Sequence, residues 1–282
     1  MRHRRTLKRQ VSFSGQGLHT GEYSSITLKP NDGRGYIFTF GEKSFPLEIA
    51  GFSGDGRGTV LHFPGGRDLG TVEHLMSALR GIDIDDVEVC INEGREAPSL
   101  GGNGLSYAQV LTDAGLEEKE EPVLPITLSI PLGVDLEEQG CSIMAFPSQS
   151  FRITYIIDYD NAVIGTQMKS VIINPESYLE DVAPARTFAL ERDLKELKNR
   201  GLAMGGNLSN AILVRENDVV TDGGLRYEDE FVRHKILDLL GDLAILGSAL
   251  CLHIVCIKGG HPLHLKFVRK LARVRRISAE RE

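Results

Sequence analysis

Apolar and polar residues follow one another in short runs along the chain, and these runs predict many strands and fewer helices. In the first half, apolar or alternating runs typical of strands lie at 11–15, 24–30, 36–40 and 87–92, and helical spacing lies at 71–80 and 105–114. The second half predicts strands near 123–134, 141–146, 151–158, 169–173, 211–214 and 252–257, and helices near 189–199, 230–247 and 262–275.

An acidic run with two prolines, GLEEKEEPVLP at 115–125, is the best candidate for a domain boundary. We therefore predict two similar domains, 1–118 and 119–282, because the order of elements after the run resembles the order before it. The fold class is α+β, with each domain a mainly antiparallel or mixed sheet layered against paired helices. Helices from both halves can then meet at a common interface, where sites often form.

Composition and charge narrow the classes of function. The chain has 282 residues, 41% hydrophobic and 25% charged, with a net charge of −7, which is typical of a soluble globular protein. The negative charge and the low aromatic content argue against a nucleic-acid partner. A basic run, Lys266 to Arg276, predicts a solvated helix face, and a nucleotide or phosphate contact there is the less favoured alternative.

Cysteine usage and the absence of long apolar runs indicate a cytoplasmic protein. The four cysteines lie in apolar runs without CxxC spacing, so neither a disulfide scaffold nor a thiolate metal site is predicted. No window approaches 18 uninterrupted apolar residues, and we expect at most peripheral contact with a membrane. A monomer is the expected state.

The segment FVRHKILDLLGDLAIL, 231–246, carries a polar stripe on an otherwise apolar helix. His234, Asp238 and Asp242 recur every four residues, so a helix brings their side chains together. Taken alone, the stripe is equally typical of an amphipathic surface helix whose core face is Ile236, Leu239, Leu240 and Leu243. Other segments must decide whether it is a site.

Two further segments offer acid and base groups. In GTVEHLMSALRG, 70–81, the helical core pattern leaves Glu73 and His74 directed away from the core. In IKGGHPLH, 257–264, two glycines present His261 after a strand, where it can reach a cleft or can simply be a turn residue.

Together these segments supply the set His74, His234 and Asp238, two imidazoles and a carboxylate of the kind that binds zinc (Zn²⁺) and equally suits Fe(II). Glu73 and His261 can then act as base and acid in the hydrolysis of an amide. The spacing does not force this grouping, because there is no HExxH motif. Competing chemistries fit less well, since the chain has no P-loop, no GxSxG and no dinucleotide-binding glycine pattern.

Five segments in order resemble the motif series of the UDP-3-O-acyl-N-acetylglucosamine deacetylases, a family of zinc amidases of lipid A biosynthesis. They are GLHTGE at 17–22, TVEHL at 71–75, ARTF at 185–188, GLRYEDEFVRHKILDLLGDL at 224–243 and GGHPL at 259–263. The matches cover essentially the whole chain. The resemblance implies two α+β domains with the zinc site at their interface.

The resemblance also implies roles for individual residues. The zinc ligands would be His74, His234 and Asp238, with Glu73 as general base and His261 as general acid. Asp242 would support His261, and Thr187 would hydrogen-bond the oxyanion. The residues expected to bind the substrate are His19, Phe188, Lys235, Leu194 and Ala203, the last two in an inserted element around 185–214 that forms an apolar passage for the acyl chain. The alternative is that the leucines of this element are helix core.

One segment departs from the family pattern. APSLGGNG at 97–104 has Gly101 and Asn103 where the family usually carries an aspartate and a serine. We still expect hydrolysis of the acetamide of the acylated UDP-sugar, giving acetate and the free amine, the committed step of lipid A biosynthesis. The alternatives are an amidase of the same fold acting on another N-acyl sugar nucleotide, and a sugar-nucleotide binding protein without activity.

Overall fold

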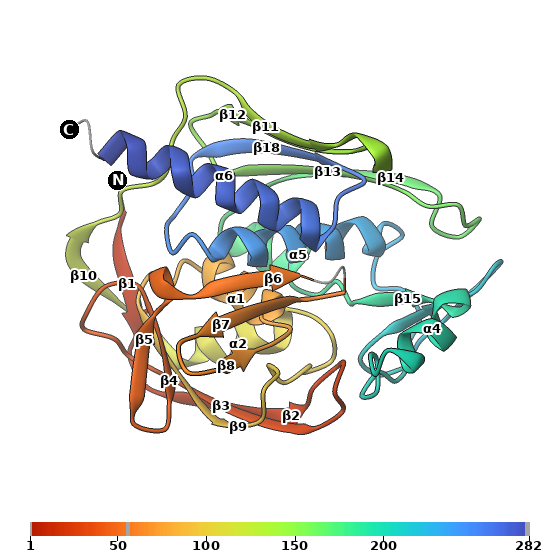
Figure 1. Cartoon of the computed structure of the whole chain (residues 1–282), viewed down its shortest axis with the longest axis horizontal. Helices are drawn as coiled ribbons and strands as arrows, with labels where there is room; N and C mark the ends of the chain where they lie inside the picture. Colours follow the sequence, from red (N-terminus) through yellow and green to blue (C-terminus); the bar gives the residue numbers. More distant parts are fainter. Residues whose placement is uncertain (1, 55–56, 280–282) are drawn as a thin grey trace.

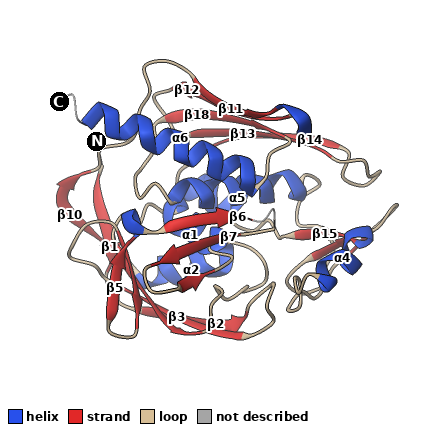
Figure 2. Ribbon diagram, viewed as in Figure 1, coloured by secondary structure: helices blue, strands red, loops and turns tan. Residues whose placement is uncertain are grey.

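Two layered halves build the molecule, a computed structural model that describes residues 2–54 and 57–279, with the side chains of 49 and 275–279 left undescribed. Figures 1 and 2 show a sheet on each outer side, with the long helices between them. The fold class predicted from the sequence, α+β with sheets layered against helices, is confirmed.

The first half is built around a five-stranded sheet in the order β2-β3-β9-β4-β5. Its strands are β2 (Val11–Gln16), β3 (Tyr23–Lys29), β4 (Tyr36–Phe40), β5 (Lys43–Pro46) and β9 (Val87–Glu93). All neighbours are antiparallel except β4 and β9, which are parallel. Helix α1 (Glu73–Gly81) precedes the central strand β9, and α2 (Leu105–Ala114) follows it.

The second half repeats this topology. Its sheet has the order β11-β12-β18-β13-β14, and its only parallel pair is β13 with β18. The strands are β11 (Leu132–Leu136), β12 (Cys141–Pro147), β13 (Arg152–Asp158), β14 (Thr166–Ile172) and β18 (Leu252–Ile257). Helix α5 (Glu230–Ala244) precedes the central strand and α6 (His261–Ala279) follows it. The similarity of the two halves is thus one of strand order, since no sequence repeat is visible.

Smaller elements complete the two halves. They are β1 (His3–Leu7), β6 (Gly51–Gly54), β7 (Thr59–Phe63), β8 (Arg67–Leu69), β10 (Leu116–Pro122), β15 (Phe188–Leu190), β16 (Ile212–Val214), β17 (Val219–Val220), α3 (Pro175–Ser177), α4 (Leu194–Asn199) and the short turns η1 (Leu47–Ile49), η2 (Glu137–Gln139), η3 (Tyr178–Val182) and η4 (Glu191–Asp193). The insertion with β15 and α4 lies at one side of the molecule (Figure 1).

Alternation along the strands explains why each sheet has one inner face. In β3 and β13 every second residue is buried, which directs one set of side chains onto the helices and leaves the other set toward the outside. Helices α1 and α5 lie between the two sheets and pack on each other, so they are buried on nearly every side. The polar stripe of α5 is therefore an interior feature, and the surface-helix alternative is wrong.

Two predicted elements differ from the observed ones. The helix predicted at 189–199 begins only at Leu194, because Phe188–Leu190 pairs with β16 as a strand. The strand predicted near 123–134 begins only at Leu132, as β11. Prolines at 122, 125 and 131 precede it, and proline cannot donate a hydrogen bond to a neighbouring strand.

The predicted domain division after residue 118 stays a prediction. The position falls inside β10, which pairs with β1 of the first half as far as Pro122. The acidic run is therefore a strand at the edge of the first half, and it does not form a flexible linker.

Three other predictions concern the surface and the cysteines. In the described ranges no helix is long and apolar enough to cross a membrane. The basic run on α6 partly anchors the helix, because Lys266 and Lys270 donate to the carbonyls of β11 and Arg269 stacks on Phe52. The side chains of Arg275 and Arg276 lie outside the described part. All four cysteines are free.

Candidate metal centre and active site

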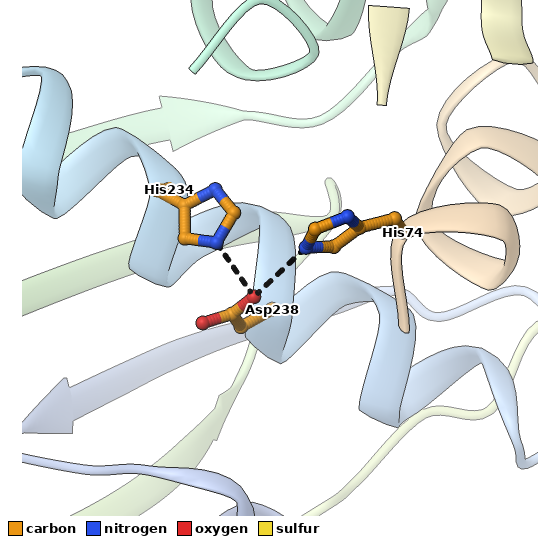
Figure 3. Close-up of side chains that lie close together, drawn as sticks. All are labelled: His74, His234 and Asp238. Atoms are coloured by element: carbon orange, nitrogen blue, oxygen red, sulfur yellow. Dashed lines mark ion pairs between the residues drawn. The ribbon is translucent and has the colours of Figure 1, made fainter. Parts of the chain in front are cut away.

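The packing of α1 on α5 brings two histidines and an aspartate together. His74 Nε2 lies 3.9 Å, and His234 Nε2 3.2 Å, from the same oxygen of Asp238, Oδ1. Figure 3 shows the two rings, one from each helix, pointing at this carboxylate. All three side chains are buried, and one ligand atom from each lies within 4.8 Å of the others. The structure therefore brings His74 next to His234 and Asp238, which lie 160 or more positions further along the chain.

A glycine permits this close approach of the two helices. Gly241 of α5 lies against the backbone of Glu73, so closely that a Cβ there would be 2.7 Å from the Glu73 Cα. Helix α1 begins at Glu73, two residues after Thr71, whose φ of 50° turns the chain into the helix. The Thr71 hydroxyl donates to the buried Glu96 carboxylate, which holds this turn. Glu73 and His74 are thus placed by backbone contacts at the start of α1.

The three side chains fit a divalent metal ion in their chemistry. His234 Nδ1 donates to the carbonyl of Ala185 at 3.1 Å, which orients the ring with Nε2 toward Asp238. Burial, followed by the nearby His234, lowers the pKa of His74 to about 3, so its ring is neutral. Burial opposes ionisation of Asp238, yet His234 and Lys235 hold its pKa well below the usual value. Two imidazoles and a carboxylate are a common donor set for zinc and Fe(II).

Glu73 is a buried carboxyl beside this cluster. Its Oε2 accepts a hydrogen bond from the backbone N–H of Thr59 at 2.9 Å. Burial raises the pKa of Glu73 to about 7. A carboxyl with such a pKa can take up and release a proton near neutral pH.

His261 forms a second titratable pair of the site, together with Asp242. Its Nδ1 is 2.8 Å from Asp242 Oδ2, and its Nε2 is 3.9 Å from Asp238 Oδ2. Burial lowers the pKa of His261, but the Asp242 carboxylate outweighs it and raises the pKa to about 9. Asp242 is completely buried and accepts a further hydrogen bond from the Thr59 hydroxyl at 2.6 Å. His261 can therefore carry a proton into a neutral-pH reaction.

The segment 185–188 and Lys235 border the cluster. The Lys235 ammonium contacts Asp238 Oδ2 at 2.9 Å and lies 5.6 Å from the centre of the Phe188 ring. Phe188 in turn faces the His234 ring at 6.4 Å between ring centres. Thr187 donates its backbone N–H to the carbonyl of Gly102 and lines the neighbouring cavity.

An apolar cavity of about 300 Å³ adjoins these residues and reaches into the insertion. It is lined by Leu18, His19, Arg57, Thr187, Phe188, Ala189, Leu194, Leu197, Lys198, Ala203, Gly206, Asn207, Leu208, Ala211, Ile212 and Leu213. Leu194, Ala203 and His19 of the predicted substrate set are among them. Leu190 and Leu202 of the same inserted element are not. The leucines of the insertion therefore line a cavity as well as pack its small core.

His19 connects the cavity with the acid and base groups. Its Nε2 is 3.1 Å from the carbonyl of Arg57, and its backbone N–H donates to Glu96. Gly58 lies between His19 and Glu73, since a Cβ there would be 3.5 Å from His19 Nε2 and 3.2 Å from Glu73 Oε1. His19 is thus near the point where the cavity meets Glu73.

The unusual loop 97–104 lies against the insertion. Gly102 has a φ of 65°, and a Cβ on it would collide with the backbone of Asn210. Asn103 is buried; it donates to the Gly101 carbonyl and accepts from the N–H of Ser106 at the start of α2. The loop therefore supports Thr187 through Gly102 and has its own internal hydrogen bonds.

Sequence reasoning missed several residues that hold the site. Thr59 bridges Glu73 and Asp242, Glu96 holds the turns of His19 and Thr71, and His264 shares Asp242 with His261. Thr59 and Glu96 follow no periodic pattern, so nothing local marks them. His264 had a signal, because it follows His261 by one helical turn.

These observations together describe a candidate metal-dependent hydrolase of two layered α+β halves. Comparison with known proteins is consistent with it. Residues 4–273 match the family of UDP-3-O-acyl N-acetylglycosamine deacetylases. A UDP-3-O-acyl-N-acetylglucosamine deacetylase of Chlamydia muridarum is 38% identical over 275 residues, which cover 96% of this chain and 95% of that protein.

Two further relatives carry the same name. The protein of Chlamydia caviae is 39% identical, covering 97% of this chain and 98% of its own length, and that of Oleidesulfovibrio alaskensis is 37% identical, covering 95% and 88%. The chain belongs to the UDP-3-O-acyl N-acetylglycosamine deacetylase family, whose members are hydrolases of an amide. The resemblance seen in the sequence motifs is confirmed.

Proposed function

We propose that this chain hydrolyses the acetamide of UDP-3-O-acyl-N-acetylglucosamine to UDP-3-O-acyl-glucosamine and acetate, with zinc held by His74, His234 and Asp238. The observation that carries the proposal is the meeting of this buried donor set with an acid and a base group beside an apolar cavity of about 300 Å³. Family membership supports the substrate class. We further propose a cytoplasmic monomer that contacts membranes at most peripherally.

The first step, attack of water on the amide carbonyl, requires a base near that carbonyl. When bound, zinc acts as a Lewis acid that polarises an amide carbonyl and makes water acidic enough to attack at neutral pH. Glu73 takes up the proton of the attacking water, because its pKa of about 7 lets it accept a proton and release it again. Thr59 holds one Glu73 oxygen and leaves the other free for this task.

The second step, cleavage of the C–N bond, requires stabilisation of the negative charge on the oxyanion and a proton for the leaving nitrogen. The Thr187 hydroxyl can donate to the developing oxyanion. His261 donates its proton to the leaving amine, and Asp242 keeps the ring oriented and protonated beforehand. Glu73, His261 and Asp242 are already buried in place, so these three groups need little reorganisation.

Binding of the substrate divides between polar and apolar regions. The cavity around Leu194 and Ala203 takes the acyl chain, because its lining is mostly apolar. Lys235 and Phe188, which stand between the cavity and Asp238, would hold the sugar ring, and His19 contacts it where the cavity meets Glu73. Energy from the acyl chain, remote from the amide, can thereby serve the chemical step.

Acetate release tests the proposal. Protein stripped with a chelator is assayed on the acylated UDP-sugar before and after one equivalent of zinc, with Fe(II) in parallel. We expect zinc to restore turnover, His74→Ala to lose both metal and activity, and Glu73→Gln to keep the metal while losing about 100-fold or more in kcat. Gln is a matched control because it still accepts the Thr59 N–H.

Two results would contradict the proposal. Tight binding of the sugar nucleotide without any acetate from the zinc-loaded protein would favour a binding protein. Equal kcat/KM on the substrate with and without its 3-O-acyl group would favour another N-acyl sugar nucleotide, because the apolar cavity would then contribute nothing.

A further inference from the structure

Asp242 holds two histidines through one carboxylate oxygen. His261 Nδ1 and His264 Nδ1 each lie 2.8 Å from Asp242 Oδ2, while the Thr59 hydroxyl is 2.6 Å from Oδ1. His261 and His264 stand one turn apart at the start of α6. Only His261 has a place in the proposed reaction, so the fully buried His264 calls for an explanation.

The chemistry of the partners indicates which atoms donate and which accept in this cluster. Burial opposes ionisation of Asp242, but His261 and His264 lower its pKa below the usual value, so it is an acceptor only. His264 therefore donates from Nδ1. A neutral ring that donates from Nδ1 offers Nε2 as an acceptor, and the Tyr155 hydroxyl lies 2.9 Å from it and can donate. Burial, which lowers the pKa of His264, favours this neutral ring. A directed chain runs from Tyr155 through His264 to Asp242.

The same cluster supports the loop that carries His261. Gly259 packs against it, since a Cβ there would be 2.9 Å from the Tyr155 hydroxyl and 3.2 Å from His264 Nε2, and would overlap the Cys256 sulfur. The glycine at position 259, two residues before His261, is thus required by the cluster. Tyr155 on β13 and His264 on α6 therefore constrain the backbone of residues 258–261 by packing against Gly259.

A second metal ion does not explain this cluster. Asp242, His261 and His264 are close enough together to suggest one. However, both nitrogens are at hydrogen-bond distance from the same oxygen, and the hydroxyls of Thr59 and Tyr155 are partners of the remaining atoms, so no ion is needed to satisfy these groups. Direct N–H···O bonds account for the geometry.

We propose that His264 and Tyr155 are positioning residues that hold the Asp242 carboxylate, and through it the His261 ring, in the orientation needed for proton transfer. The proposal rests on the proposed deacetylase function. Neither side chain has any exposed surface, whereas Glu73 and His261 keep 2% and 3%, so neither is placed to touch the substrate. Without His264, Oδ2 keeps a single partner and the carboxylate can turn about its axis, so His261 loses its fixed direction.

The test compares His264→Leu with His264→Asn in the zinc-loaded enzyme. Asparagine places an N–H near the position of Nδ1 and keeps the donation to Asp242, whereas leucine fills a similar volume without a donor. We expect His264→Leu to lower kcat by about 10- to 100-fold with KM and metal content unchanged. His264→Asn should recover most of this loss. Tyr155→Phe should lower kcat by about 2- to 10-fold.

Two controls separate positioning from mere stability. Phe267→Leu, one turn further along α6 and fully buried, should lower the unfolding midpoint without lowering kcat. In an Asp242→Asn background, His264→Leu should add no further loss of kcat, because its route to His261 is already cut.

The outcomes distinguish this inference from the function on which it rests. A wild type without acetate release contradicts the function, and with it the inference. An active wild type with His264→Leu within twofold of its kcat overturns the inference alone, as does His264→Asn losing as much as leucine. If His264→Leu does not fold, the other two variants decide. The inference is overturned if Tyr155→Phe has the kcat of the wild type and His264→Asn is nevertheless impaired.

Discussion

Replacing Gly241 by alanine tests how closely α1 must approach α5. In a free helix this change would stabilise by about 0.8–1.0 kcal/mol, because glycine is a poor helix former. Here the new Cβ would stand 2.7 Å from the Glu73 Cα, and closer still to its carbonyl group. Ordinary carbon contacts begin near 3.5 Å, so the helices must separate by at least about 0.8 Å.

The separation opposes the gain in helix propensity. Overpacking of this kind costs about 1–3 kcal/mol, so we expect a net change in the free energy of unfolding between about zero and 2 kcal/mol, in the destabilising direction. The effect on activity should be larger, because Glu73 and His74 move with their backbone. A displacement near 1 Å can cost about 100-fold in rate, and we expect at least a tenfold loss of kcat.

Urea unfolding, metal content and acetate release measure the three effects. Ile236→Val, on the core side of the same helix, is the matched control: it should lose about 0.5–1.5 kcal/mol of stability with unchanged kcat. Full activity together with higher stability in Gly241→Ala would refute the reasoning, because it would mean that the two helices separate without cost to the site.

Three more predictions follow from other contacts. Arg186→Met strands the buried Glu230 carboxylate and should cost about 3–5 kcal/mol in urea unfolding, with part recovered by adding Glu230→Gln; no recovery would contradict the ion-pair explanation. Burial opposes ionisation of Glu230, but Arg186 lowers the pKa of this carboxyl below its unfolded value of about 4.3. The stabilisation from Glu230 is therefore present above the unfolded pKa and is lost as the pH falls through the lower folded pKa. Glu230→Gln should flatten this acid limb of the curve of unfolding free energy against pH, and an unchanged limb would contradict the prediction. Ala211→Phe narrows the cavity and should lower kcat/KM by about tenfold or more on the acylated substrate but barely on an analogue without the acyl group, whereas equal losses would show that the chain binds elsewhere.

Local pattern was sufficient for much of the fold. Helix α2 occupies the predicted residues 105–114, and the central strand β18 the predicted 252–257. Their spacing of apolar residues matches a single regular period, so short-range preference and burial agree. Where a segment had two possible partners, pattern failed: Phe188–Leu190 continues a helical spacing but pairs with Ile212–Val214, which lies more than 20 residues further on.

The acid, base and donor groups were visible in the sequence, and their assembly was not. His234, Asp238 and Asp242 share a stripe because a helix returns to the same side every four residues, so their mutual nearness needed no tertiary information. Their meeting with His74 depends on the crossing of α1 and α5, which Gly241 permits through a contact with Glu73. A residue's neighbours across such a crossing leave no local trace.

The supporting contacts were decided by the tertiary structure alone. Thr59, Glu96 and Tyr155 come from strands or loops, and they act through hydrogen bonds whose partners are chosen by packing. The sequence determined which side chains could do chemistry and which helix faces carried them. The layering of two sheets around a buried helix pair decided which of them meet, because burial from both sides turns a polar stripe into a site.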